Sequence, residues 1–188
     1  MIRITAGEWR GRRIRTPSGQ DTRPSPSRVR EAVFNILGPL GEEAVFLDLY
    51  AGSGAMGLEA LSRGAPQAVF YESSRKAMEV LRKNIRDLGC RDRTETVSDP
   101  IPPALVGGRL RLEGAAVAFL DPPYRRDLAP PTLQALADAW PAVPAGGDPS
   151  VAIAQTERNA PMAERYGGWR LQKSYRHGDT QLWLYELP

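Results

Sequence analysis

The sequence has very few of the residues from which disulfides and most transition-metal sites are built. Its 188 residues include one Cys, Cys90, and one His, His177. A single Cys excludes an internal disulfide and is typical of a reducing compartment, so we expect a cytoplasmic protein. One His and one Cys cannot form a His/Cys metal site, and no cluster of carboxylates with metal-ligand spacing is present, so we expect no metal.

Long apolar runs are also missing. No stretch approaches about 18 consecutive apolar residues, which excludes a transmembrane helix. The first residues, MIRITAGEWRGRR, contain no apolar core of a secretory signal. Hydrophobic residues make up 41% of the chain and charged residues 25%, which is enough apolar material for a folded core. We expect a monomeric protein without membrane contact.

Lysine is scarce, so the positive charge is carried by arginine, and it is unevenly distributed. Residues 1–30 hold eight Arg against two acidic residues, a net charge of +6, whereas the whole chain carries +3. Guanidinium groups bind oxyanions in a bidentate manner, so a cluster of Arg alone indicates phosphate contacts. A solvated surface is the alternative. We interpret residues 1–25 as an Arg-rich hairpin and loop extension, followed by one domain over 26–188.

Hydrophobic periodicity predicts an α/β fold. Short apolar runs alternate with amphipathic helical segments as far as residue 155, and this alternation is typical of βαβ units with a parallel sheet. Two alternating runs around His177-Gly178-Asp179 add an antiparallel hairpin. The expected strands lie at 44–50, 67–72, 94–99, 115–124 and 149–155, and the fourth of these segments is a strand that runs into a Pro-rich loop. The expected helices lie at 27–37, 58–64, 74–89 and 130–140, and the hairpins at 2–15 and 169–187.

A glycine-rich loop follows the first strand of this pattern. Residues 52–57 read GSGAMG, which satisfies G-x-G-x-x-G between a strand and a helix, and Glu72 ends the next strand. Such a loop lets the backbone approach a ligand, and a carboxylate at that position accepts hydrogen bonds from ribose. NAD and S-adenosylmethionine both fit, and a turn without a ligand is the simpler alternative. Asp48 would repel a pyrophosphate but can hold an α-ammonium group, unless it is a structural Asp.

A second motif, Asp121-Pro122-Pro123-Tyr124, follows the fourth strand. Ligands of doubly wound sheets sit at the carboxyl ends of the strands, so this loop faces the same crevice as the glycine loop. The prolines stiffen the turn and remove donors, which leaves the Asp121 carboxylate and the Pro122 carbonyl as acceptors for a planar NH₂ group. Tyr124 offers a ring on which a base can stack. A rigid turn with a surface Tyr is the alternative.

With these motifs the chain resembles the amino-methyltransferases that modify exocyclic nitrogens of bases. The segments AGEWRGRRI (6–14), TRPSPSRVREAVFNIL (22–37) and GAMGLEALSRGA (54–65) are similar to the 16S ribosomal RNA guanine-N2 methyltransferases that act on guanine 966. The resemblance implies a class I methyltransferase fold, which is a Rossmann-like, doubly wound, mostly parallel seven-stranded sheet with an antiparallel terminal hairpin. It also implies S-adenosylmethionine as methyl donor and 16S RNA or a small-subunit assembly intermediate as substrate.

The resemblance also assigns the site residues. The implied cofactor-binding residues are Asp48, Ala51, Gly52, Ser53, Gly54, Glu72 and Asp99. The target base would be held by Asp121, Pro122 and Tyr124. We add phosphate contacts from Arg10, Arg12, Arg13, Arg23, Arg28 and Arg30. The expected reaction is an in-line displacement, in which guanine N2 attacks the S-methyl carbon and needs mainly to be positioned.

Three other functions remain open at this point. The same chemistry could serve a DNA adenine-N6 or cytosine-N4 methylase, although the chain leaves little room for a domain that reads DNA sequence. The glycine loop could belong to an NAD-dependent oxidoreductase, which has no use for the Asp-Pro-Pro-Tyr loop. A non-catalytic RNA-binding module would keep the Arg-rich start without needing Asp48, Glu72 and Asp121 together.

Overall fold

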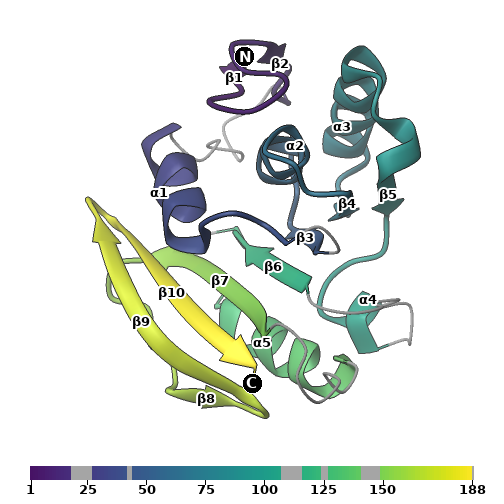
Figure 1. Cartoon of the computed structure of the whole chain (residues 1–188). Helices are drawn as coiled ribbons and strands as arrows, with labels where there is room; N and C mark the ends of the chain where they lie inside the picture. The colour runs from purple at the N-terminus through teal and green to yellow at the C-terminus, as the bar shows by residue number, and fades with distance from the viewer. Residues whose placement is uncertain (18–26, 42–43, 107–115, 124–126, 141–148, 188) are drawn as a thin grey trace.

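The computed structural model describes residues 1–17, 27–41, 44–106, 116–123, 127–140 and 149–187. Its centre is an eight-stranded sheet in the order β5-β4-β3-β6-β7-β10-β9-β8 (Figure 1). The strands are β3 (Val45–Leu49), β4 (Gln67–Tyr71), β5 (Thr94–Val97), β6 (Ala116–Leu120), β7 (Ser150–Glu157), β8 (Arg165–Tyr166), β9 (Trp169–His177) and β10 (Thr180–Leu187).

Strand direction confirms the predicted fold class. β3 to β7 run parallel to their neighbours, whereas β10 and β9 add antiparallel strands at one side. The strand order reverses at β3, which is typical of a doubly wound sheet. The sheet has one strand more than predicted, because the two-residue β8 pairs with β9 at the edge. Two residues are too short to show any hydrophobic period.

Helices cover both faces of the sheet, which explains why its central strands are apolar runs rather than alternating ones (Figure 1). Phe46, Phe70 and Phe119 belong to the core that includes side chains of α1 (Ser27–Leu37), α2 (Ala55–Ser62) and α3 (Arg75–Leu88). On the other face, Leu47 and Leu120 belong to the core shared with the short α4 (Pro103–Val106), which the sequence analysis missed, and with α5 (Ala129–Ala139).

Local signals set the bounds of α3 close to the predicted 74–89. The Ser74 hydroxyl accepts a hydrogen bond from the Ala77 N–H at 3.4 Å, which caps the first turn. Gly89 has a left-handed φ of 73° and ends the helix. A short 3₁₀ turn, η1 (Arg91–Arg93), then leads into β5.

The chain start forms a separate two-stranded sheet, β1 (Ile2–Arg3) and β2 (Arg13–Ile14), which packs on the helical layer. Ile4 and Trp9 are buried in the same core as the first three helices. The turn of this hairpin lies at the end of α2, where the Glu8 N–H donates to the Ser62 carbonyl at 2.7 Å. Residues 1–17 therefore lie along the helices, and the strands are shorter than predicted.

A buried carboxylate joins this hairpin to two helices. Glu59 of α2 is fully buried and accepts hydrogen bonds from the Thr5 N–H at 2.9 Å and the Ala6 N–H at 3.0 Å. It also accepts from Arg63 Nε at 3.0 Å, and Arg30 Nε lies 3.9 Å from its Oε2.

Arg30 departs from the sequence interpretation. Its side chain is only 2% exposed, and its guanidinium donates to the Arg3 carbonyl at 2.6 Å. The expectation that Arg30 contacts RNA phosphate is therefore wrong. The guanidinium instead offsets the buried charge of Glu59, and we assign it to stability.

Candidate active site

The carboxyl edge of the parallel strands brings together acidic residues from four neighbouring strands. Asp48 lies within β3, Glu72 directly follows β4, Asp99 follows β5 and Asp121 directly follows β6. Because these strands are parallel and adjacent, their carboxyl ends meet at one edge of the sheet, where doubly wound folds bind their ligands. The structure thus places the acidic residues that were predicted for the cofactor and for the target amine at the same edge.

The glycine loop leaves β3 in a conformation that exposes its backbone. Gly52 has a φ of 56°, and a Cβ atom built there would meet nothing within 4 Å, so its backbone borders open space. Gly57 has a different reason to be glycine. A Cβ atom on Gly57 would lie 2.3 Å from the Phe70 ring, so the missing side chain lets α2 pack closely on β4. The loop can therefore meet a ligand with bare backbone.

Glu72 is tied to the rim of this loop. Its Oε2 accepts a hydrogen bond from the Gly52 N–H at 2.7 Å, and its Oε1 accepts from the Ser74 N–H at 2.6 Å. The residue is half-buried. Each carboxylate oxygen keeps a further lone pair, so Glu72 can accept additional hydrogen bonds from a diol without releasing the loop.

Asp48 lies beneath the loop and is 2% exposed. Its Oδ2 accepts a hydrogen bond from the Gly57 N–H at 2.9 Å, in the first turn of α2. Burial raises the pKa of Asp48 well above its usual range, and the carboxylates of Asp121 and Glu72 raise it further. Asp48 thus has the structural contact that was considered as the alternative. A cationic ligand beside the carboxyl groups of Asp48, Asp121 and Glu72 would relieve their mutual repulsion, whereas a pyrophosphate would add to it.

Asn84 of α3 is a positioning residue that the sequence analysis missed. It is 1% exposed, and its Nδ2 donates to the Ser53 carbonyl at 2.9 Å and to the Arg15 carbonyl at 3.0 Å. Its Oδ1 accepts from the Arg15 N–H at 2.8 Å. One side chain therefore joins the N-terminal hairpin to the glycine loop. A polar residue on an amphipathic helix gives no sequence signal for such a role.

The turn after β6 is anchored to the neighbouring strand. The Asp121 N–H donates to the Leu49 carbonyl at 3.4 Å, Asp121 is half-buried, and Pro122 is buried. This places Asp121 beside the end of β3, from which the glycine loop leaves. Tyr124 and Arg23, which were predicted to stack on the base and to contact phosphate, lie outside the described residues.

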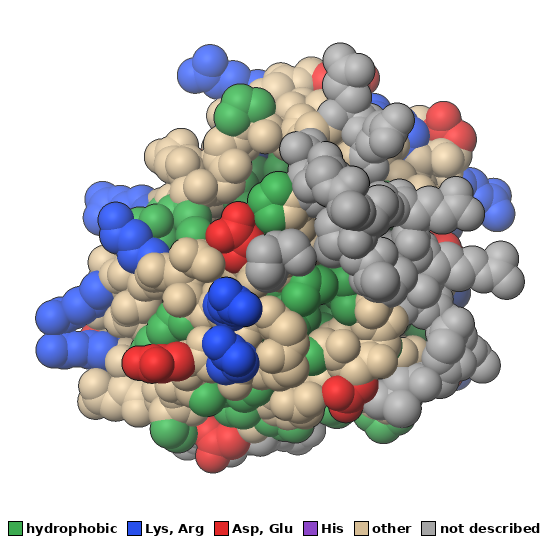
Figure 2. Space-filling view, turned by 60° about the horizontal axis from the view of Figure 1, so that its bottom comes forward, with side chains coloured by type: hydrophobic (Ala, Val, Ile, Leu, Met, Phe, Trp, Pro, Cys, Tyr) green, Lys and Arg blue, Asp and Glu red, His purple; other side chains and the backbone are tan. Residues whose placement is uncertain are grey.

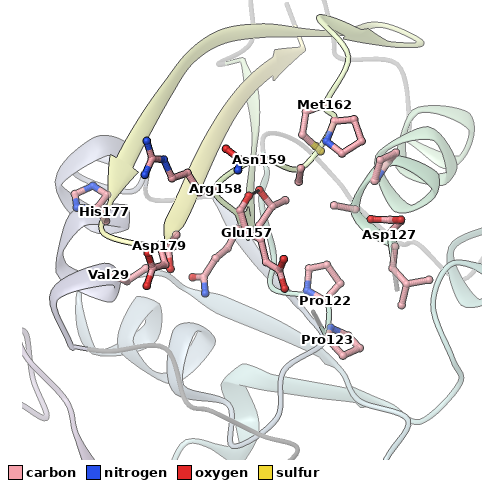
Figure 3. Close-up of a pocket in the computed structure, with 18 residues that line it drawn as sticks. Val29, Pro122, Pro123, Asp127, Glu157, Arg158, Asn159, Met162, His177 and Asp179 are labelled. Atoms are coloured by element: carbon pink, nitrogen blue, oxygen red, sulfur yellow. Dashed lines mark hydrogen bonds between the residues drawn. The ribbon is translucent and has the colours of Figure 1, made fainter. Parts of the chain in front are cut away.

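A cavity of about 800 Å³ opens beyond this turn (Figure 3). It is lined by Pro122 and Pro123, by Val29 of α1, by the end of β7 and by the turn between β9 and β10. The volume is in the range of small-molecule sites and can take a nucleotide. The sequence analysis missed its polar lining, Glu157 to Asn159, because the predicted strand stopped at residue 155 and β7 continues to Glu157.

Exposed cations lie on two surfaces. Arg10, Arg12, Arg13 and Arg28 are exposed, and Arg12 also donates to the Asp87 carbonyl at 2.5 Å. The turn of the N-terminal hairpin lies beside Ser62, at the C-terminal end of α2, whereas the glycine loop precedes the N-terminal end of this helix. At a rise of about 1.5 Å per residue, the two ends of α2 are about 12 Å apart. Figure 2 shows further basic side chains on the side of the β9–β10 hairpin. The exposed cations on and beside that hairpin include Arg158, Lys173 and Arg176.

The described residues offer neither a metal cluster nor a membrane-spanning helix. They contain no group of three or more His, Cys, Asp or Glu side chains that could hold a metal ion. None of the helices in these ranges has the length and apolar character needed to cross a membrane.

Comparison with known proteins connects this geometry with an enzyme family. A family model described as Conserved hypothetical protein 95 matches residues 2–186. Ribosomal RNA small subunit methyltransferase D of Escherichia coli K12 is 34% identical over 189 residues, which is 99% of this chain and 90% of that protein. The structure of yhhF from Escherichia coli matches with a TM-score of 0.81 and 33% identity, over 99% of this chain and 97% of that chain.

A more distant structure shares the fold. An RNA methyltransferase from Salinibacter ruber, solved in complex with S-adenosyl-L-homocysteine, matches with a TM-score of 0.59 and 17% identity, over 88% of this chain and 94% of that chain. The family model, the identity and the coverage agree with the predicted family and fold. The chain therefore belongs to the Conserved hypothetical protein 95 family and is a methyltransferase with the class I fold.

Proposed function

We propose that the protein transfers a methyl group from S-adenosylmethionine to N2 of a guanine in 16S ribosomal RNA. One observation carries the proposal: the Asp121-Pro122 turn lies at the sheet edge from which the glycine loop also leaves, and Pro122 lines a cavity of about 800 Å³. The relative from Escherichia coli is named for the small-subunit ribosomal RNA, which supports this substrate. We also propose that the enzyme acts as a cytoplasmic monomer on the RNA or on an assembly intermediate.

The residues around the loop fit S-adenosylmethionine, which supplies the methyl group as a sulfonium. Bare backbone at Gly52 borders open space, and the carboxyl groups of Asp48, Asp121 and Glu72 lie close enough to repel one another, so a ligand with a sulfonium and an α-ammonium group would be stabilised there. In our proposal Ala51, Ser53 and Gly54 complete the loop around the methionine end, Glu72 holds the ribose and Asp99 meets the adenine. The Salinibacter ruber neighbour shares the fold and was solved with S-adenosyl-L-homocysteine, which agrees with this choice of cofactor.

On the substrate side, Asp121 and Pro122 would position the target amine. The Asp121 carboxylate and the Pro122 carbonyl each accept one hydrogen of the NH₂ group, so the nitrogen lone pair points toward the crevice. No strong base is needed, because the amine becomes acidic only after it has received the methyl group. We propose that the Tyr124 ring stacks on the target base, which has left its helix or is already unpaired.

Replacing Glu72 by Ala is expected to weaken S-adenosylmethionine binding about 10- to 100-fold, because hydrogen bonds to a charged acceptor are worth ~1.5–3 kcal/mol. Isothermal titration calorimetry measures the change. The matched control is Glu95→Ala, which removes an exposed carboxylate from the neighbouring β5 and should leave the affinity unaltered. An unchanged Kd for Glu72→Ala would assign Glu72 to the structure of the loop alone.

The arginines of the N-terminal hairpin are expected to serve RNA rather than cofactor. Changing Arg10, Arg12 and Arg13 together to Ala should lower RNA affinity and flatten its salt dependence, by about 0.7–0.9 in log–log slope for each phosphate that is no longer bound. Filter binding over a salt series measures the slope. The control variant changes Arg82 and Arg86, two exposed arginines of α3. Equal slopes for wild type and the hairpin variant would leave these arginines as a solvated surface.

Mapping the methylated nucleotide tests the proposed function directly. Small-subunit RNA and assembly intermediates are incubated with the protein and S-adenosylmethionine, and the modified position is identified by mass spectrometry of nuclease fragments. A single N2-methylguanosine in 16S RNA is the expected product. Methylation of adenine N6 or cytosine N4, or of duplex DNA in a parallel reaction, would contradict the proposal and favour a DNA methylase.

A further inference from the structure

Beyond the turn after β6, the cavity contains a carboxylate that the chemistry described so far does not use. Glu157 is the last residue of β7, it is exposed, and it lines the same cavity as Pro122 (Figure 3). In the part of the chain that the structure describes, no hydrogen bond or ion pair of its carboxylate is found. The Thr156 hydroxyl donates a hydrogen bond to the Glu157 backbone carbonyl at 2.9 Å, not to the Glu157 carboxylate.

Strand register places this carboxylate beside the proposed acceptors of the target amine. β6 and β7 are parallel, with Leu120 opposite Ala154, so the turn that begins at Asp121 runs alongside the last three residues of β7. Ile153 and Phe119 both point to the face covered by α1, α2 and α3. Because side chains alternate along a strand, Glu157 continues the Ile153 side and Asp121 continues the Phe119 side. The two carboxylates therefore share one face of the sheet.

Guanine, adenine and cytosine differ in whether the ring nitrogen next to the amine can donate a hydrogen bond to a second carboxylate. In guanine, one of the two ring nitrogens that flank the exocyclic N2 amine, N1, carries a hydrogen, so N1–H and N2 form two adjacent donors on the Watson–Crick edge, whereas N3 on the other side is an acceptor. The ring nitrogens next to the amines of adenine and cytosine are acceptors, and a carboxylate repels them. A carboxylate next to the amine-binding turn thus favours guanine, because two acceptors that face each other once the base covers them cost more than a missing contact.

We infer that Glu157 is the specificity-determining residue for guanine, accepting a hydrogen bond from N1–H while Asp121 and Pro122 hold the N2 amine. This inference rests on the proposed function, since it takes guanine N2 as the methylated atom. It explains why a carboxylate lies in a cavity that must admit RNA, where its charge opposes phosphate. It also gives the end of β7 a role in the reaction.

The test replaces the target guanine by 2-aminopurine, which keeps the exocyclic amine but has an acceptor at N1. Small-subunit particles assembled on 16S RNA with either base at the mapped position are methylated by wild type and by Glu157→Gln. Wild type should prefer guanine at least 100-fold in kcat/KM, because a site built for a hydrogen bond rejects analogues that lack it by about 10⁴–10⁵ in favourable cases. Glu157→Gln should reduce this preference at least tenfold, since its amide can donate to N1.

Controls separate this role from folding, from general charge and from failure of the function itself. Asp179→Asn neutralises another carboxylate that lines the cavity and should keep the wild-type preference. The melting temperature and cofactor affinity of Glu157→Gln should match wild type. If wild type methylates guanine and Glu157→Gln shows the same preference over 2-aminopurine, the inference is overturned. If wild type itself methylates no guanine N2, the proposed function fails instead.

Discussion

Asp121→Ala is expected to abolish methyl transfer while S-adenosylmethionine binding stays within a few-fold of wild type. The Asp121 carboxylate follows β6 and faces the target amine in our proposal, whereas the cofactor lies on the glycine loop after β3. Losing a positioned charged acceptor of this kind lowers kcat about 10²–10³-fold, or ~2.7–4 kcal/mol of transition-state stabilisation. Single-turnover kinetics with enzyme in excess over RNA measures the chemical step, and calorimetry measures the affinity for the cofactor.

Two further variants sharpen this experiment. Asp121→Asn keeps the shape and one acceptor oxygen, so we expect it to retain more activity than the Ala variant. Asp127→Asn removes a carboxylate from the same cavity, and Asn tolerates the positive φ of 44° at this position, so its activity should stay near wild type. Near-normal turnover by Asp121→Ala would rule out the mechanism in which Asp121 positions the target amine.

The sheet and the crevice could be predicted because their sequence signals are local. Each central strand is a short apolar run, each amphipathic helix has a stripe, and the glycine loop and the Asp-Pro-Pro turn stand directly after strands. In a parallel sheet, adjacency of strand ends then follows from the topology alone. This is why Glu72 and Asp121, 49 residues apart in the printed sequence, could be expected at one edge of the sheet.

What could not be predicted depends on tertiary contacts between polar residues. The burial of Arg30 follows from Glu59 on another helix, and a helical stripe of apolar residues carries no information about such a partner. Asn84 likewise looks like a residue of a solvated face until Arg15 and Ser53 are placed next to it. Glu157 was missed for a simpler reason, because β7 extends beyond its apolar residues.

Glu59 provides the second large expected effect, on stability rather than on catalysis. Its carboxylate is fully buried and serves the backbone of the N-terminal hairpin and the side chain of Arg63, with the buried Arg30 nearby. Burial lowers the pKa of Arg30, and the charge of Glu59 opposes this shift. A substitution of Glu59 therefore removes the counter-charge that offsets the burial of the Arg30 guanidinium.

Glu59→Ala should lower the free energy of unfolding by about 3–5 kcal/mol, because it leaves a buried charge without its main counter-charge. The Thr5 and Ala6 N–H groups would also lose their acceptor. Urea denaturation measures the loss. At ~2–4 °C per kcal/mol for a chain of this size, the melting temperature should fall by about 10 °C. The matched control is Glu79→Ala, which breaks an exposed pair with Arg75 and should cost less than about 0.5 kcal/mol. Equal stabilities of the two variants would show that the contacts of Glu59 do not hold the hairpin on α2.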